Sequence, residues 1–508
     1  MPSSWSSSRP DLHLDLDPAG GRRSAVENAL REAVRSGRLA AGTLLPSTRG
    51  LAADLGLARG TVTAAYDQLV EEGYLTARPG SGTTVADLPP ARPGPAVPVA
   101  ADSVEPRHDL RAGRPDVSAF PARAWLAATR RVLDRARPEV FGPADPQGRI
   151  ELRTALADHL GRTRGVITTA DRVVITSGFY QSLGLLAAVL RARGATTVAT
   201  EDPGHNLHRD VIRRAGLTVT SLPVDAHGAR VEELTRRTDA VLLTPSHQYP
   251  TGVPLHPARR HRLLGWARAT GGTVVEDDYD GEFRYDRRPV GALQGAAPDH
   301  VVHCGTASKT LAPALRLAWL VLPPALVPEV VRAKEADDLY TEALGQLVLA
   351  ELIATHAYER HVRAARIRYR RRRELLLDRL AAAETAVPTA AAAPTTAAPL
   401  TAGPVLTAHG VPAGLHTLLT LPADGPDEPA VLAACARRGV ALRGLAELHH
   451  DPAGRPGGLL IGFAAPSERA FPAALDALFP ALFPALSPAL SPAPLPAPAS
   501  RPDPGEPR

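Results

Sequence analysis

The chain contains 58 lysine and arginine residues, but only two of them, Lys309 and Lys334, are lysines. Lys309 lies in the stretch TASKTLAPALRLAW, where Thr306 and Ser308 precede it and Arg316 follows it. A lysine amine forms a Schiff base with an aldehyde, and arginine cannot replace it in that reaction. Hydroxyls and an arginine are the donors that a phosphate requires. The stretch therefore favours an aldehyde cofactor that carries a phosphate; the alternative is an ordinary surface amine.

A second polar group follows the short apolar run RVVIT, which is typical of a buried strand. The run leads through a Ser-Gly turn into a helical pattern. The backbone amides of Gly178, Phe179 and Tyr180 would then point from a helix N-terminus at an anion such as a phosphate. Many strand-to-helix turns contain glycine, so this signal is weak when it stands alone.

A third group ends the run GTVVE, where Asp277 and Tyr279 lie in the stretch EDDYDGEFRY. Carboxylates at a strand end are metal ligands, acid-base groups or partners of a buried cation. Pyridoxal 5′-phosphate (PLP) fits these groups together, because its aldehyde reacts with lysine and its ring nitrogen pairs with a carboxylate. We therefore predict a PLP site around Lys309, with a cofactor-free body as the alternative.

The elements that would position these groups alternate in the sequence between short β-branched runs and helical patterns. RVVIT, TTVAT, AVLLT, GTVVE and VVHCG are such runs. This alternation predicts an α/β fold with a mostly parallel sheet covered on both faces. Ligands of such sheets bind at the carboxyl ends of the strands.

The first part of the chain has a different pattern, of three helices and a hairpin. Val26, Leu30 and Val34 recur at helical spacing, and Ser47 is placed to cap a second helix. A third helix is followed by two short strands joined through PGSG. Helix, turn, helix and β wing is the order of a winged helix-turn-helix.

Several polar residues of this module are placed to bind double-stranded DNA. Arg59 and Thr61 begin the third helix and would face base edges, and Arg49 would contact a phosphate. At the wing, a phosphate would meet Arg78, Gly80, Ser81, Gly82 and Thr83. The alternative is a three-helix module for protein contacts, in which these arginines are only solvated.

Length and composition limit the fold class, the partners and the location of the protein. At 508 residues, with 44% hydrophobic and 22% charged residues, it should be globular with two or more domains. The net charge of +5 permits nucleic-acid binding without arguing for it. Two cysteines without metal-ligand spacing suit a reducing compartment and predict no metal site. No signal peptide or membrane span is recognisable, so we expect a cytoplasmic protein.

Segments rich in proline and alanine suggest the domain boundaries. We expect a flexible N-terminus at 1–20, a winged helix-turn-helix domain at 21–86, a Pro/Ala-rich linker at 87–107, a PLP-binding body at 108–478 and a Pro/Ala-rich disordered tail at 479–508. Part of the tail could instead be a docking segment.

Two resemblances then become visible. LPSTRGLAADLGLARGTV and EEGYL…SGT resemble the GntR class of bacterial winged-helix regulators. The motifs FGPADPQGRIELRTALADHL, TSGFYQSL, EDPGHN, TPSHQYPTGVPL, EDDYDGEFRY, TASKTLAPALRLAWLV and HVRAARIRYRRRRELL resemble fold-type I, class I aminotransferases. The tandem order resembles the MocR subfamily, which joins the two. This resemblance implies a smaller C-terminal α+β subdomain after the large sheet.

The MocR resemblance also implies roles for individual residues. Lys309 would hold PLP as an aldimine, Asp277 would pair with the pyridine nitrogen, and Tyr279 would bond the ring hydroxyl. The cofactor phosphate would be held by Thr306, Ser308, Arg316 and the amides of Gly178, Phe179 and Tyr180. His205 stands where the family usually has a tyrosine that stacks on the ring.

Other positions depart from the family pattern. Ala58 replaces a serine that caps the recognition helix. Tyr249 stands where aminotransferases have asparagine, and Phe141 replaces a tyrosine that often reaches the partner subunit's cofactor. Leu460 occupies the position of the arginine that binds the substrate α-carboxylate. Arg443 is nearby in sequence, but the sequence does not show that it substitutes.

These resemblances imply a homodimeric, PLP-dependent transcriptional regulator that binds an operator or promoter. The aminotransferase-like body would act as effector sensor and dimerisation unit. Its effector would be the cofactor itself, or a small amine or amino acid. We expect no physiological turnover; the alternative is an active PLP-dependent aminotransferase with an accessory DNA-binding domain.

Overall fold

The structure, a computed structural model, describes residues 14, 16, 21–87, 106–286, 290–386, 406–423 and 425–486. Most of the expected N-terminal segment and linker, and residues 487–508 of the expected tail, lie outside these ranges. The chain divides into two compact units, Met1–Val104 and Glu105–Arg508, each of which is described separately.

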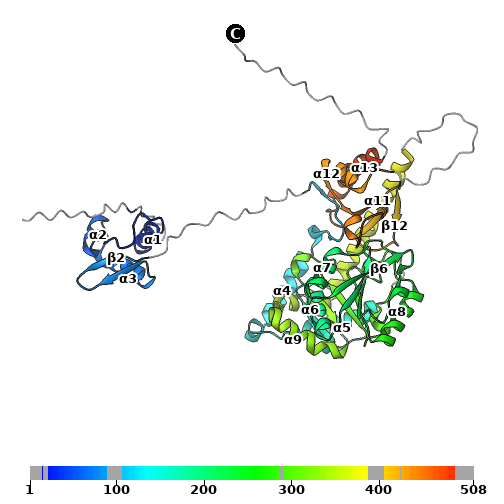
Figure 1. Ribbon diagram of the computed structural model, residues 1–508, viewed down its shortest axis with the longest axis horizontal. Helices are drawn as coiled ribbons and strands as arrows, with labels where there is room; N and C mark the ends of the chain where they lie inside the picture. Colours follow the sequence, from blue (N-terminus) through cyan, green and yellow to red (C-terminus); the bar gives the residue numbers. More distant parts are fainter. Residues whose placement is uncertain are drawn as a thin grey trace, which may run out of the picture. The chain divides into compact units, whose positions relative to one another are not determined.

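The N-terminal unit is a winged helix-turn-helix, as the pattern of its apolar residues predicts (Figure 1). Its elements are helices α1 (Arg22–Arg35), α2 (Thr48–Asp54) and α3 (Arg59–Glu71) and the antiparallel strands β1 (Leu75–Arg78) and β2 (Gly82–Val85). Val26, Leu30, Val62 and Leu69 are fully buried where the helices meet. Leu14 and Leu16, which the sequence suggested to be flexible, pack against this core.

The two helices of the helix-turn-helix begin differently. Ser47 caps α2, as predicted, because its hydroxyl accepts a hydrogen bond from the Gly50 amide at 3.1 Å. Ala58 precedes α3 with extended backbone but no side-chain acceptor. The first amides of α3 therefore lack the acceptor that a capping side chain supplies.

We expect Ala58→Ser to stabilise the N-terminal unit by about 1 kcal/mol. Amide hydrogen exchange along α3 in the full chain should slow by about fivefold. Ala53→Ser, at an exposed position inside α2, is the control and should give no stabilisation, because serine inside a helix is no better than alanine. Equal effects of the two variants would contradict the capping argument.

The second unit is built on an eight-stranded sheet with the order β4-β11-β10-β9-β8-β5-β6-β7. The neighbours from β10 through β9, β8 and β5 to β6 are parallel, whereas β11 is antiparallel to both β4 and β10. The strands are β4 (Val173–Thr176), β5 (Thr197–Asp202), β6 (Thr218–Asp225), β7 (Gly228–Ala229), β8 (Ala240–Leu243), β9 (Thr273–Asp277), β10 (Val301–Thr306) and β11 (Ala318–Val321). The predicted mostly parallel sheet is therefore confirmed.

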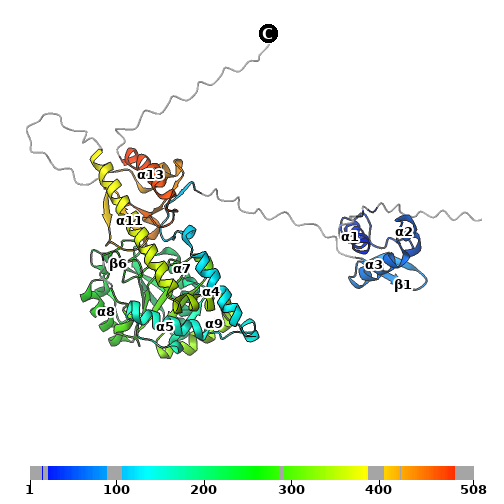
Figure 2. The same ribbon diagram turned by 180° about the vertical axis from the view of Figure 1, so that it is seen from behind.

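Helices cover both faces of this sheet (Figures 1 and 2). Successive side chains of β9 point to opposite faces of the sheet, and both faces are apolar: Val275 packs in one apolar cluster and Val274 in another. The cluster of Val275 includes residues of α6 (Phe179–Ala192), α7 (Asn206–Arg214) and α9 (Val327–Asp338). The other face is covered by α4 (Ala122–Arg135), α5 (Ile150–Arg164), α8 (Pro257–Thr270) and α10 (Ala343–Ala354).

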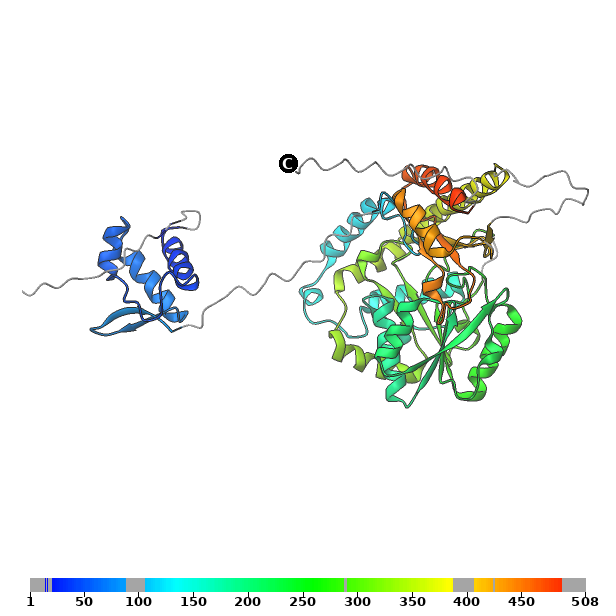
Figure 3. The ribbon, with the colours of Figure 1, turned by 45° about the horizontal axis from the view of Figure 1, so that its top comes forward.

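A smaller α+β subdomain follows, as expected from the resemblance. Its sheet has the order β12-β13-β16-β15, and a short parallel pair joins β14 to β3. The strands are β3 (His108–Asp109), β12 (Thr407–His409), β13 (His416–Thr420), β14 (Val440–Ala441), β15 (Arg443–Gly444) and β16 (Gly458–Gly462). Helices α11 (Ala357–Ala386) and α13 (Ala470–Leu486) lie side by side in this subdomain, which α12 (Glu428–Arg437) completes (Figure 3).

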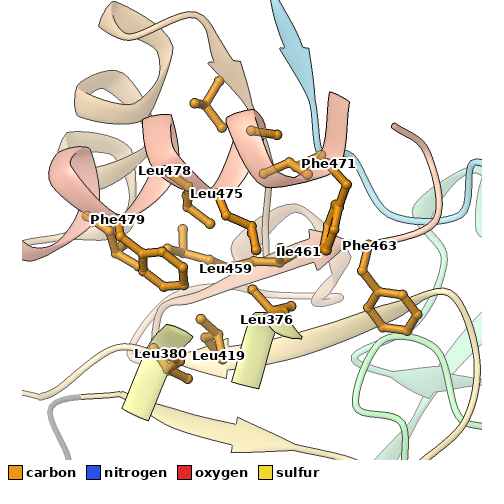
Figure 4. Packing of buried hydrophobic residues seen from close by; sticks show 14 of the residues in the cluster. Leu376, Leu380, Leu419, Leu459, Ile461, Phe463, Phe471, Leu475, Leu478 and Phe479 are labelled. Carbon is orange, nitrogen blue, oxygen red and sulfur yellow. The ribbon is translucent and has the colours of Figure 1, made fainter. Parts of the chain in front are cut away.

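Helix α13 corrects the expected start of the tail at 479. The helix continues to Leu486, and Phe479, Leu482 and Phe483 are buried in the subdomain core, part of which is drawn in Figure 4. Pro480 lies inside the helix although its ring removes a backbone donor. Burial of large apolar side chains, each contributing about 1.5–3 kcal/mol, offsets that loss. The Pro/Ala composition concealed an apolar helical face.

Candidate functional site

A cavity of about 270 Å³ lies at the carboxyl ends of β5, β8, β9 and β10, where the smaller subdomain meets the large sheet. Every residue that we predicted to bind the cofactor lines this cavity, except Gly178, which lies beside Arg316. The lining comprises Ala112, Gly113, Phe179, Tyr180, Thr200, Glu201, Gly204, His205, His208, Leu242, Leu243, Thr244, Tyr249, Asp277, Tyr279, Thr306, Ser308, Lys309, Pro313, Arg316 and Arg443.

Lys309 lies in the turn after β10, and its amine reaches into the cavity. Nζ donates a hydrogen bond to the backbone oxygen of Gly113 at 2.7 Å. Burial lowers the pKa of Lys309 below its usual value, and the charges of Asp277 and Asp280 oppose this shift. A lower pKa leaves more of the amine neutral near neutral pH, which is the form that attacks a carbonyl.

Alternation at the end of β9 assigns different surroundings to three successive acidic residues. Glu276 accepts hydrogen bonds from the amides of Leu293 and Gln294, and Asp278 forms a buried ion pair with Arg164 at 2.7 Å. Asp277 alone faces the cavity. Burial raises the pKa of Asp277 well above its usual value, although the nearby Lys309 opposes the shift.

The hydroxyl of Tyr279 lies 3.1 Å from Nδ1 of His247, which is itself 2.8 Å from a carboxylate oxygen of Asp280. Burial raises the pKa of Tyr279 well above its usual value, so the phenol keeps its proton. Tyr279 can therefore donate a hydrogen bond to a ligand atom inside the cavity.

Donors for an anion gather at the start of α6. Gly178 has a φ of +126°, and a Cβ placed on it would lie 2.6 Å from Nη2 of Arg316. Arg316 itself has a φ of +52°, a left-handed conformation that is rare for residues other than glycine and common at ligand sites. The Ser308 amide donates to the Thr306 hydroxyl at 3.1 Å, and that hydroxyl donates to Ser308 Oγ at 3.0 Å. Amides, hydroxyls and a guanidinium thus converge, as predicted for a phosphate.

His205 presents a neutral ring to the cavity. It stacks on His208, with centroids 4.3 Å apart and an interplanar angle of 9°. Burial, aided by the charge of Arg443, lowers the pKa of His205 to about 3. Its Nδ1 is buried without a hydrogen-bond partner among the described residues. A flat, neutral imidazole is compatible with the predicted stacking on an aromatic ligand.

Some residues of the cavity were not predicted from the sequence. Glu201 lies at the end of β5, and burial raises its pKa to about 7, against hydrogen bonds from Thr244. His208 lies in the first turn of α7. The EDPGHN motif marks the loop between these residues, so it could have indicated both. Arg443, which comes from the smaller subdomain, had no such local signal.

The predicted DNA-contacting residues lie in the N-terminal unit. Arg49 and Arg59 are exposed near the N-termini of α2 and α3, whereas Thr61 is partly buried. Arg78 is exposed at the end of β1. Gly80 and Ser81 lie in the turn of the hairpin, Gly82 and Thr83 begin β2, and Gly80 and Gly82 both have positive φ. These positions match those expected for a recognition helix and a wing.

Comparison with known proteins identifies both units. Residues 22–85 match the family of bacterial regulatory proteins called gntR, and residues 108–399 match aminotransferase class I and II. The chain is 33% identical to the probable rhizopine catabolism regulatory protein MocR of Rhizobium meliloti over 72% of its length and 78% of the relative. The chain belongs to the MocR subfamily of GntR regulators.

Other MocR-like relatives agree with this assignment. The HTH-type transcriptional regulator YhdI of Bacillus subtilis is 32% identical over 81% of this chain and 85% of the relative. The pyridoxine biosynthesis regulator PdxR of Corynebacterium glutamicum is 33% identical over 73% and 82%. The protein is therefore an HTH-type transcriptional regulator with an aminotransferase-like domain, and GntR-type HTH domains bind DNA.

Solved structures confirm the fold of the MocR body. A kynurenine aminotransferase of Pyrococcus horikoshii is 24% identical, with a TM-score of 0.63 over 74% of this chain and 90% of that one. An archaeal alanine:glyoxylate aminotransferase is 23% identical, with a TM-score of 0.65 over 75% and 91%. Both therefore share a fold-type I architecture with this chain.

Aminotransferases of this fold family use PLP, and the cavity of the MocR body fits that group. The buried carboxyl of Asp277 accepts no hydrogen bond from any described residue, so a protonated ring nitrogen would give it a partner. A side chain at Gly178 would collide with Arg316, so the absence of a Cβ keeps this corner open. Lys309 supplies the amine on the same cavity wall.

Proposed function

We propose that this protein is a PLP-responsive transcriptional regulator in which the winged helix binds an operator and the aminotransferase-like body senses an effector. The observation that carries this proposal is the convergence of Lys309, Asp277 and Arg316 on one cavity in a chain that begins with a GntR domain. When bound, PLP supplies an aldehyde that reacts with an amine. Lys309 would hold its aldehyde carbon, Asp277 its ring nitrogen, Tyr279 its ring hydroxyl and Arg316 its phosphate.

A regulatory role without physiological turnover is supported by Leu460. This side chain is fully buried in β16 and packs in one apolar cluster with Tyr249 and Tyr279. In aminotransferases an arginine at this position fixes the orientation of the substrate carboxylate through two half-reactions, and leucine cannot supply that contact. We therefore expect kcat for transamination to remain below about 1 s⁻¹.

Dimerisation of the body is supported by apolar side chains that it exposes. Leu126 and Leu133 lie two turns apart on α4 and are 51% and 44% exposed, and Phe141 is 63% exposed. Apolar surface of this kind is typical of a protein interface. A two-fold dimer would present two winged helices to paired half-sites, and ligand binding in the body would shift their arrangement.

The proposal is tested by the affinity of the full chain for the DNA upstream of its own gene, measured with and without PLP and candidate amines. Addition of PLP should change the dissociation constant or the footprint on that DNA. Identical binding with and without PLP and amines would show that the body does not sense this cofactor.

Substitutions in the N-terminal unit should separate two kinds of DNA contact. Arg49→Ala should weaken binding to all sequences alike and reduce the slope of log K against log salt by about 1, since it removes one phosphate contact. Arg59→Ala should cost about 1–3 kcal/mol and relax the preference for one base pair. Competition with single-base operator variants at several salt concentrations measures both effects, and the same loss pattern in both variants would contradict the placement of α3.

A further inference from the structure

Arg443 lines the cavity because β15, which contains it, pairs with β16 in the smaller sheet. Its Cα partner on the antiparallel neighbour β16 is Leu460. Side chains of directly paired residues lie on the same face of a sheet and next to each other. The cation that the sequence lacks at position 460 is therefore present one strand away, on the wall of the same cavity.

The guanidinium of Arg443 is held by three partners and is not saturated. Nε donates to Glu447, Nη1 to the Tyr249 hydroxyl at 3.3 Å and Nη2 to the Asn206 side-chain oxygen at 3.0 Å. A guanidinium has five N–H donors, so one on each of Nη1 and Nη2 has no partner within the described ranges. Glu447 is 46% exposed on its side chain, so water can solvate its carboxylate when another anion takes Arg443.

The charge of Arg443 acts on the part of the cavity where a cofactor ring would lie. It contributes to the low pKa of His205, whose ring is stacked beside the cavity, after the larger effect of burial. Arg316 supplies a second guanidinium, beside Gly178, for the phosphate. Arg316 lies just before β11 of the large sheet, whereas Arg443 lies in β15 of the smaller one, so the cavity offers one anion site beside the large sheet and another on the small subdomain.

We infer that Arg443 binds the carboxylate of an amino-acid effector. This inference rests on the proposed function and narrows its effector to amines that carry an acid group. A planar guanidinium with one free N–H on each terminal nitrogen suits a carboxylate, which accepts two hydrogen bonds. Asn206 begins α7, and Glu447 lies in the segment after β15. Binding of the carboxylate would draw the guanidinium of Arg443 away from both side chains.

The experiment is calorimetric titration of the PLP-loaded full chain with glycine, L-alanine and β-alanine, each paired with an amine in which a methyl group replaces the carboxylate. These amines are ethylamine, isopropylamine and propylamine. In the unmodified protein, at least one amino acid should bind roughly 10- to 100-fold more tightly than its paired amine, because a charge-assisted contact is present. Arg443→Gln should reduce that ratio to near one, and Arg443→Lys should restore part of it.

Arg437→Gln is the matched control, because it removes an exposed arginine of α12 that does not line the cavity, and it should keep the ratio. Lack of discrimination in the unmodified protein, or discrimination that survives Arg443→Gln, overturns the inference. Equal weakening of both members of a pair also overturns it, since Arg443 would then only support the cavity. Failure to bind PLP would overturn the proposed function as well, whereas PLP binding without discrimination overturns this inference alone.

Discussion

Lys309→Ala should yield a protein that is colourless after unbound PLP is removed, whereas the unmodified chain remains yellow. The change removes the amine on the cavity wall and leaves the surrounding donors in place. The affinity for PLP should fall steeply, and the effect of PLP on operator binding should disappear, while binding of the cofactor-free protein to DNA is retained. Visible absorbance and an operator-binding titration measure these results.

A second substitution and chemical labelling also test the role of Lys309. Lys309→Arg keeps a positive charge near Asp277 but cannot form the covalent bond, so it should also be colourless. After borohydride reduction of the PLP-loaded protein, the added mass should map to the peptide that contains Lys309. Lys334, the other lysine, is fully buried and paired with Asp338, so it should remain unmodified. Yellow absorbance in Lys309→Ala, or label at another amine, would refute the role given to Lys309.

The sequence predicted elements whose signals are local. Ser47 is a cap because its neighbours along the chain begin a helix, and the buried strands are recognisable because their residues are β-branched. The corner of the cavity in which Gly178 lies beside Arg316 was also predicted, because Gly178 and the residues from Thr306 to Arg316 each lie in one short motif. Periodicity and spacing suffice where the interacting groups are close in sequence.

Contacts between distant segments could not be predicted in this way. The surroundings of Arg443 depend on Asn206, Tyr249 and Leu460, which come from a helix, a loop and a neighbouring strand. Register between β15 and β16 decides that Arg443 faces the cavity, and a shift by one residue would turn it away. The different surroundings of Asp277, which faces the cavity, and Asp278, which pairs with Arg164, likewise became clear only from the side of the sheet to which each points.

At the end of the body, the prediction from amino-acid composition was wrong and the spacing of apolar residues was the better guide. Proline and alanine dominate the sequence after 478, which favours a disordered tail. Phe479 and Phe483 are nevertheless one helical turn apart and stack with their centroids 6.2 Å apart. An apolar pair at this spacing, directly after the expected end of the body at 478, indicates a helix and carries more information than the proline content.

Gly178→Ala should weaken PLP binding by roughly 30-fold, which corresponds to about 2 kcal/mol, because it disturbs one charge-assisted contact to the phosphate. The added methyl group would lie 2.6 Å from Nη2 of Arg316 and 2.9 Å from its Cζ, so the guanidinium must move. The φ of +126° is also strained for alanine, which shifts the first amides of α6. Equilibrium titration followed by absorbance gives the dissociation constant.

Gly184→Ala, in the same helix α6, separates this effect from a general effect of replacing glycine. A Cβ at Gly184 approaches no atom closer than 3.9 Å, and its φ is not positive, so alanine should be tolerated and should stabilise the helix by up to about 1 kcal/mol. PLP affinity should therefore be unchanged in Gly184→Ala and reduced in Gly178→Ala. If both variants bind PLP as tightly as the unmodified protein, the phosphate does not lie between Gly178 and Arg316, and the orientation of the cofactor in this cavity is wrong.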